Sequence, residues 1–281
     1  MAPVARKVNA KHTWNDLVLP PATLEQLHEF CARVVNSEYV LTQWGFERKL
    51  SMGKGTTGVF AGPSGTGKTI AAEVIANEIK LDLYKVDLAA VISKYLGETE
   101  KNLDRIFTAA ENASAVLFFD EADALFGKRS EVRDSHDRYA NIEISYLLQK
   151  MEAYEGAAIL ATNLGQNMDE SFLRRFAFNI RFPFPEEDSR RRIWSTIWPQ
   201  ETPLARDIDY GYLASRFRFT GGNIKNVALA AAFLAADDGG VVTMTHLLRA
   251  IEREFEKMGK PVRCDELAAE LRVLQDNSER S

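Results

Sequence analysis

Residues 62–69 read Gly62-Pro63-Ser64-Gly65-Thr66-Gly67-Lys68-Thr69, and they fill every fixed position of the phosphate-loop pattern G-x-x-x-x-G-K-[ST]. In such a loop the glycines allow backbone N–H groups to turn toward phosphate oxygens at the start of a helix. The Lys68 ammonium then reaches the β- and γ-phosphates, and the Thr69 hydroxyl binds Mg²⁺. The sequence therefore predicts binding of a nucleoside triphosphate, ATP, together with Mg²⁺.

The residues on either side of this loop provide the context that the pattern needs. Residues 57–61 (TGVFA) predict a short buried strand. Residues 70–79 predict a helix, because Ile70, Val74 and Ile75 recur on one helical face. The alternative is a chance glycine-rich turn. The strand before the loop and the helix after it favour the phosphate loop.

The composition is that of a soluble globular protein. Its 281 residues are enough for one large domain or two smaller ones. A net charge of −5 gives no general attraction to nucleic acid or anionic membrane, and the apolar runs fall short of a membrane span. The only cysteines, Cys31 and Cys264, lie far apart, which favours a reducing compartment. We expect a cytoplasmic protein.

Strand and helix patterns alternate through the first two-thirds of the chain. This alternation predicts an α/β fold with a parallel sheet covered by helices on both faces. The predicted strands after the loop are 81–86, 115–119, 157–161 and 178–182, and the predicted helices are 103–110 and 142–151.

A different pattern begins after Pro183 and Pro185, where every segment has helical periodicity. The predicted helices there are 186–198, 209–217, 223–236 and 243–258, with an amphipathic segment at 265–274. We therefore predict a flexible arm (1–13), a nucleotide-binding domain (14–185), a helical lid domain (186–260) and a C-terminal helix and tail (261–281).

An apolar run that ends in two acids follows the pattern of a Walker B motif. Asp120 and Glu121 come directly after residues 115–119. Asp120 would hold the Mg²⁺ shell, and Glu121 would polarise a water for attack on the γ-phosphate. The tetrad Asp120-Glu121-Ala122-Asp123 also matches the box of certain RNA helicases, but the further helicase motifs are missing. A strand that ends in solvated acids is the structural alternative.

Strand 157–161 ends in Thr162-Asn163. The Asn163 amide at this strand tip can form hydrogen bonds with both the γ-phosphate and the attacking water. Asn163 could instead be a turn former ahead of Gly165. Its place two elements after Asp120 favours a functional role.

These motifs and the helical region behind the sheet together resemble the AAA+ ATPase family, and the resemblance covers nearly everything from Trp14 to Met258. It implies a P-loop αβα fold with strand order 5-1-4-3-2 and a C-terminal helical lid. That order would place the Asn163 strand between the strands of Lys68 and Asp120, and Asn163 would correspond to sensor 1.

Residues 169–176 resemble the family's arginine-finger region, in which an arginine reaches the γ-phosphate bound by a neighbouring subunit. Arg175 is the first choice for this role and Arg174 the second. Many relatives carry another arginine three residues after the finger, where this chain has Phe178. The alternative for Arg174-Arg175 is an ordinary surface pair.

Three further segments match family positions. Residues 222–226 resemble the sensor 2 region, with Lys225 where the family usually has arginine; a structural helix start capped by Asn223 is the alternative. Residues 14–19 resemble the loop that packs on adenine, although apolar core residues would look the same. In Lys94-Tyr95-Leu96-Gly97-Glu98, Tyr95 and Leu96 match a pore loop that grips a protein substrate, or else Tyr95 is a packed core residue.

Residues 44–50 and 126–142 resemble one bacterial AAA+ subgroup, which includes the ATPase encoded with phage-tail-like contractile injection systems. The resemblance implies a Mg²⁺-dependent ATPase that forms a homo-oligomeric ring, a hexamer, and remodels or unfolds a protein partner. The alternative is a nucleotide-gated switch or assembly scaffold with little turnover. A DNA-associated loader is disfavoured by the charge and by the Tyr95 loop.

Overall fold

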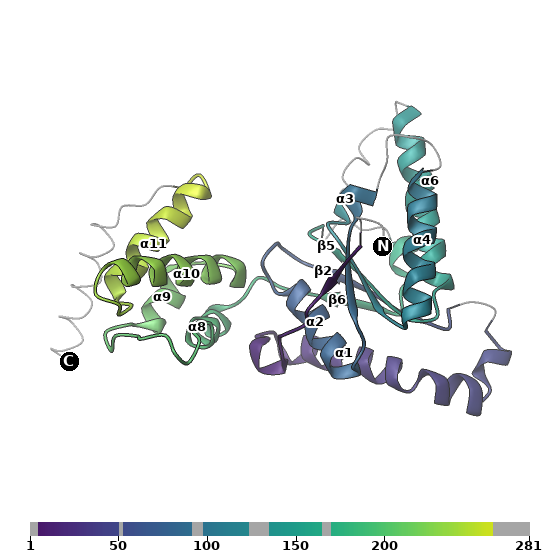
Figure 1. Cartoon of the computed structure of the whole chain (residues 1–281), viewed down its shortest axis with the longest axis horizontal. Helices are drawn as coiled ribbons and strands as arrows, with labels where there is room; N and C mark the ends of the chain where they lie inside the picture. Colours follow the sequence, from purple (N-terminus) through teal and green to yellow (C-terminus); the bar gives the residue numbers. More distant parts are fainter. Residues whose placement is uncertain (1–4, 51–52, 92–97, 124–134, 165–169, 261–281) are drawn as a thin grey trace. The chain divides into compact units, whose positions relative to one another are not determined.

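The computed structural model describes residues 5–50, 53–91, 98–123, 135–164 and 170–260 (Figure 1). It divides into two compact units, which we describe separately. One comprises Met1–Pro63 and Gly67–Pro183, and the other Ser64–Thr66 and Phe184–Ser281. The division after Pro183 lies close to the predicted domain boundary at residue 185.

The first unit is built on a six-stranded sheet in the order β1-β3-β4-β5-β2-β6. Its five parallel strands are β2 (Thr56–Ala61), β3 (Leu83–Asp87), β4 (Val116–Asp120), β5 (Ala157–Thr162) and β6 (Phe178–Arg181). The predicted α/β class is confirmed. The five parallel strands keep the predicted order, and β1 adds an unpredicted antiparallel strand at one edge.

The prediction of a flexible arm over residues 1–13 is wrong for the part that the structure describes. Ala5–Val8 form β1, which pairs with β3. The His12 ring lies 2.7 Å from a carboxylate oxygen of Glu73, and the Asn77 side chain donates to the His12 carbonyl oxygen. The sequence pattern missed these contacts because they join segments about sixty residues apart.

Each strand sends alternate side chains to opposite faces of the sheet. On β4, Leu117 and Phe119 pack beneath α4 (Glu98–Ala113) and α6 (Ser135–Ala153). Val116 and Phe118 pack on the other face, beneath α1 (Pro21–Val35) and α2 (Lys68–Ile79) (Figure 1). Burial on both faces accounts for the continuous apolar run in this strand.

Shorter elements connect these layers. They are the 3-10 helices Trp14–Asp16 and Phe46–Arg48, the π-helix Tyr39–Gln43, α3 (Leu88–Val91) and α7 (Glu170–Leu173). Helix α1 was not predicted by the sequence analysis. Its buried residues include Leu27 and Phe30, which are spaced three apart and pack against the sheet.

The second unit is all-helical in its described part, as predicted. It contains α8 (Glu187–Thr196), α9 (Tyr210–Arg216), α10 (Gly221–Asp237) and α11 (Met244–Lys257). Trp194, Leu213, Phe217 and Leu247 are buried together in a separate apolar core. The predicted helix at 265–274 lies outside the described residues. Among the described helices, none combines the length and the apolarity that a membrane crossing requires.

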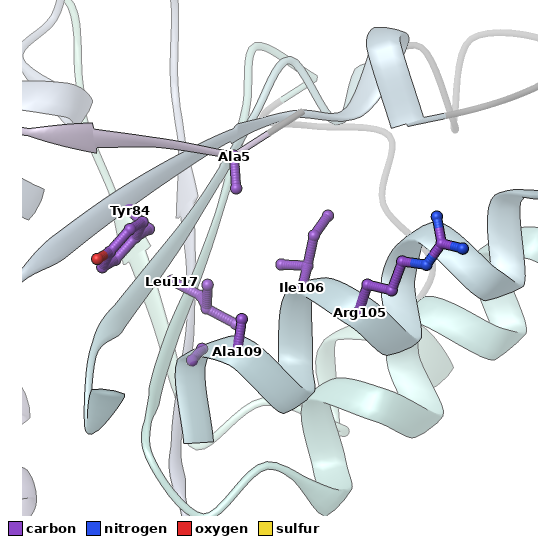
Figure 2. A pocket seen from close by; sticks show the side chains of 7 residues that line it. Ala5, Tyr84, Arg105, Ile106, Ala109 and Leu117 are labelled. Carbon is purple, nitrogen blue, oxygen red and sulfur yellow. The ribbon is translucent and has the colours of Figure 1, made fainter. Parts of the chain in front are cut away.

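A cavity of about 250 Å³ lies where the β1–β3 edge of the sheet meets α4. Figure 2 shows Ala5, Tyr84, Leu117 and Ile106 around it, with the guanidinium of Arg105 directed away from them. The lining is almost entirely apolar. Apolar side chains therefore surround an unfilled space under this edge of the sheet.

We predict that Gly62→Ala destabilises the first unit. A Cβ atom at this position would lie 2.0 Å from the Phe182 carbonyl oxygen, so the backbone beside β6 would have to shift. Such overpacking costs about 1–3 kcal/mol of unfolding free energy, measurable by urea unfolding. The matched control is Gly211→Ala in α9, where the nearest atom is a side-chain oxygen of Asp209 at 3.2 Å. Equal effects of the two substitutions would contradict the prediction.

Candidate functional site

The phosphate loop joins β2 to α2 with the backbone that its sequence requires. Gly65 and Gly67 have φ angles of +76° and +100°, a left-handed region that favours glycine. Gly67 is the N-cap residue of α2, and Lys68 is the first residue of that helix. The N-terminal N–H groups of α2 therefore follow directly on the loop, an arrangement suited to binding phosphate.

The Lys68 ammonium is the buried cation of this site, with only 8% of the residue exposed. Its Nζ donates to the carbonyl oxygens of Gly62 (2.6 Å) and Pro63 (2.9 Å) and to Oδ1 of Asn163 (2.9 Å). Burial lowers the pKa of Lys68, and the carboxylates of Asp120 and Asp123 oppose that shift. Three oxygen atoms therefore hold the charge where phosphate oxygens are expected to bind.

Asp120, at the end of β4, pairs with a lysine that the sequence analysis did not single out. Lys85 Nζ lies 2.6 Å from Asp120 Oδ2. Lys85 belongs to the neighbouring strand β3, so only the strand register reveals the pair. In the sequence, Lys85 could have been noticed only as a charged residue within the otherwise largely apolar strand pattern Leu-Tyr-Lys-Val-Asp.

The Glu121 backbone has a φ angle of +57°, which is uncommon for a residue with a side chain. Its N–H donates to Asp120 Oδ1 at 3.0 Å. Outliers of this kind cost on the order of 1–3 kcal/mol and cluster at functional sites. Glu121 is exposed directly beyond the strand end, as expected of a side chain that meets a bound ligand.

Asn163 is held by Asp123, a residue that the sequence analysis had named only as the last member of the Asp-Glu-Ala-Asp tetrad. Asp123 accepts hydrogen bonds from Thr162 Oγ1 (2.5 Å), the Asn163 backbone N–H (2.6 Å) and Asn163 Nδ2 (2.5 Å). The turn before it is fixed by a bond of 3.0 Å from the Ala122 N–H to the Ala161 carbonyl. Asp123 thus ties the end of β4 to the end of β5.

The hydrogen bonds to Asp123 also keep it ionised. Burial alone would raise the pKa of this carboxyl, but the donors Thr162 and Asn163 outweigh burial and lower the pKa below its ordinary value of 3.8. The ammonium of Lys68 acts in the same direction.

The donor set fits a magnesium ion that is shared with bound phosphates. Among the described residues, no group of three or more His, Cys, Asp or Glu side chains is placed to hold a metal. Mg²⁺ is commonly bound by one or two carboxylates together with substrate phosphates. Asp120 and the Thr69 hydroxyl supply hard oxygen ligands of this type, although Asp120 would have to share its carboxylate with Lys85.

Within one chain, Arg174 and Arg175, the candidates for the arginine finger, pair with other residues than those of the phosphate site. Arg175 Nε lies 3.7 Å from Glu152 Oε1, and the Arg174 guanidinium lies 3.3 Å from the Glu170 carboxylate. Both arginines are exposed. Their predicted action on a neighbouring subunit is not tested by these contacts.

Lys225 lies exposed on α10 in the second unit, and its sensor 2 role stays a prediction. Asn223 serves the start of that helix, but as the partner of a capping box rather than as the cap. Thr220 is the N-cap, and its backbone N–H donates to Asn223 Oδ1 at 3.1 Å.

Two other predicted segments have different outcomes. Leu17 and Leu19 are buried in the apolar core, consistent with the structural alternative for their side chains. Tyr95 and Leu96, predicted for the pore, lie outside the described residues, as do residues 126–134 of the subgroup resemblance.

The site residues lie within a segment that matches a known protein family. Residues 59–184 match the family described as "ATPase family associated with various cellular activities (AAA)". These residues have the α/β fold of an AAA domain. The match begins within β2 and ends beyond β6, so it includes the site side chains from Lys68 to Asn163.

Three similar proteins come from different organisms and carry different names. This chain is 31% identical over 205 residues to a proteasome-activating nucleotidase from Methanopyrus kandleri, covering 70% of this chain and 47% of the relative. It is 34% identical over 179 residues to a cell division cycle protein 48 homolog from Archaeoglobus fulgidus, covering 62% and 24%. An uncharacterized AAA family ATPase from Sinorhizobium fredii is 34% identical over 187 residues, covering 66% and 54%. The chain thus spans about half, or less, of the length of these relatives.

We predict a pH-dependent cost for Asp123→Asn. Because folding lowers the pKa of Asp123, its carboxylate contributes stability above the ordinary value of 3.8 and loses that contribution as pH falls through the lowered pKa. The difference in unfolding free energy between wild type and variant should be largest near neutral pH and shrink below pH 3.8. Urea unfolding across this range measures it. A constant difference would show that the lost contribution is not electrostatic.

Proposed function

We propose that this AAA protein is a Mg²⁺-dependent ATPase. The observation that carries the proposal is the convergence of three groups at the carboxyl ends of β2, β4 and β5. The Lys68 ammonium, the Asp120–Glu121 pair and the Asn163 amide all belong to this edge. Ligands of open parallel sheets bind at the carboxyl ends of the strands.

Each group has a defined task in the proposed reaction. Lys68 exchanges its carbonyl and amide partners for β- and γ-phosphate oxygens and offsets their charge. Glu121 accepts a proton from a water that attacks the γ-phosphorus, and Asn163 orients this water. Mg²⁺, held by Thr69 and Asp120, would supply charge stabilisation at the phosphate oxygens.

We further propose that the active form is a homo-oligomeric ring, a hexamer, that remodels a protein partner. Arg175, with Arg174 as the second choice, is exposed and so available to a neighbouring subunit. One similar protein is named a proteasome-activating nucleotidase, which favours a protein rather than a nucleic acid as the partner. Tyr95 and Leu96 would contact the threaded polypeptide, and Lys225 would contact phosphate from the lid.

We also propose that this protein works with a contractile injection system in the bacterial cytoplasm. This proposal rests on the sequence resemblance to the bacterial subgroup. Trp44 and Phe46, part of that resemblance, are 63% and 52% exposed, and Tyr39 packs against the Trp44 ring. Large exposed apolar groups favour a surface that meets another protein. A binding assay between this protein and the purified injection apparatus tests this proposal. We expect Trp44→Ala and Phe46→Ala to abolish the binding.

The alternative is a nucleotide-gated switch or scaffold that turns over little ATP. The strained Glu121 backbone favours the enzyme, because a protein that only binds ATP has no need of that geometry. Light scattering with and without ATP and Mg²⁺ measures assembly. Phosphate release by the same sample separates the two functions.

Glu121→Gln should abolish turnover while ATP binding is retained, because the amide fills the same space but cannot accept a proton. ATP affinity by calorimetry and phosphate release measure the two properties. Lys68→Ala is the contrasting variant, and we expect it to lose binding itself. Hydrolysis by Glu121→Gln near the wild-type rate would exclude Glu121 as the base.

Arg175→Ala should lower turnover by a factor on the order of 10³ with little change in ATP binding, as expected of a finger that acts on a neighbouring subunit. Mixing Arg175→Ala subunits with Glu121→Gln subunits should restore activity, since some interfaces then contain both intact residues. Arg174→Ala tests the second choice, and we expect it to have a smaller effect than Arg175→Ala. Full activity of Arg175→Ala would contradict the assignment.

A further inference from the structure

The Asn163 amide has a partner on each side, and the two partners have opposite chemistry. Oδ1 faces the Lys68 ammonium at 2.9 Å, and Nδ2 faces the Asp123 carboxylate at 2.5 Å. An ammonium only donates hydrogen bonds, and a carboxylate only accepts them. One orientation of the amide therefore satisfies both partners. Turning it over would place two donors together on one side and two acceptors together on the other.

The Asp123 side of this arrangement is the more firmly held. Asp123 accepts from the Asn163 backbone as well as from the side chain, and from Thr162 Oγ1. The bond between the Ala122 N–H and the Ala161 carbonyl holds the two strand ends together. Releasing Nδ2 would take away a donor from a partly buried carboxylate, which is unfavourable. The hydrogen bond from Lys68 Nζ to Asn163 Oδ1 is instead expected to break when phosphate binds Lys68.

We propose that Asp123 is a positioning residue that keeps the oxygen of the Asn163 amide, and not its NH₂ group, turned toward the reacting phosphate. This inference rests on the proposed ATPase function. When phosphate takes the Lys68 ammonium, Asn163 Oδ1 is released as a hydrogen-bond acceptor. Nδ2 stays bound to Asp123 and does not donate to the γ-phosphate.

An acceptor at this position has a direct use in the proposed reaction. The attacking water has two protons and must direct a lone pair at phosphorus. Glu121 accepts one proton in the reaction, and Asn163 Oδ1 accepts a hydrogen bond from the other O–H. Two acceptors on the two O–H groups fix the orientation of the water. Asp123 therefore acts on the water through Asn163 without touching it.

Side-chain NMR of ¹⁵N-labelled protein tests the orientation without any turnover. The Asn163 NH₂ signal is assigned by its loss in Asn163→Ser. We expect its hydrogen-bonded shift in nucleotide-free protein to persist when a non-hydrolysable ATP analogue is added, and to be lost in Asp123→Asn. A signal that moves to the free or phosphate-bound position on addition of the analogue would overturn the inference.

Kinetics provide the second test. Asp123→Asn offers an amide that pairs with Asn163 in either orientation, so kcat should fall about tenfold to a hundredfold, with KM within about threefold of wild type. The matched control is Asp104→Asn. Asp104 also accepts side-chain hydrogen bonds, from Tyr146 and Lys150, but it lies on α4 away from these groups. We expect its kcat to be unchanged.

The outcomes separate this inference from the proposed function. If wild type hydrolyses ATP and Asp123→Asn has the wild-type kcat, the positioning role is wrong and the ATPase proposal stands. If wild type hydrolyses no ATP, the ATPase proposal fails. The NMR test in nucleotide-free protein then still decides whether Asp123 orients the Asn163 amide.

Discussion

The site depends on the burial of one positive charge, the Lys68 ammonium. A charge taken out of water is costly unless polar partners surround it. Here the carbonyl oxygens of Gly62 and Pro63 and the amide oxygen of Asn163 provide those partners. The parallel strands bring these oxygens together, since the ends of β2 and β5 are neighbours in the sheet. Phosphate oxygens can replace these three oxygens as partners of Lys68. The fold therefore positions the Lys68 ammonium before nucleotide binds.

The sequence was sufficient for those features whose signal is local. The phosphate loop is contiguous, and its flanking strand and helix follow from short apolar patterns. The buried strand before Asp120 was equally clear, because both of its faces are covered and every residue is apolar. The helical second unit followed from periodicity after Pro185. The strand that ends before Asn163 lies between β2 and β4, as the family resemblance implied, although only the structure shows which groups hold Asn163.

The sequence could not predict contacts between segments that are far apart in the chain, because these contacts depend on how the strands pair. Lys85 meets Asp120 only because β3 and β4 are adjacent. Asp123 meets Asn163 across forty residues of sequence, and nothing local distinguishes it from a solvated acid after a strand. The N-terminal arm was misjudged for the same reason, since polar residues such as His12 bind partners on α2. The proposed action of Arg175 on a neighbouring subunit depends on contacts that a single chain does not contain.

The edge strand β1 has a consequence for the behaviour of the protein in concentrated solution. An exposed strand offers unpaired backbone groups to other chains and so invites aggregation. Within the described residues, β1 is the end strand of the sheet and is four residues long. It also carries the cations Arg6 and Lys7. A short, positively charged strand is a poor template for pairing, so β1 protects the longer apolar strands behind it from joining those of another molecule.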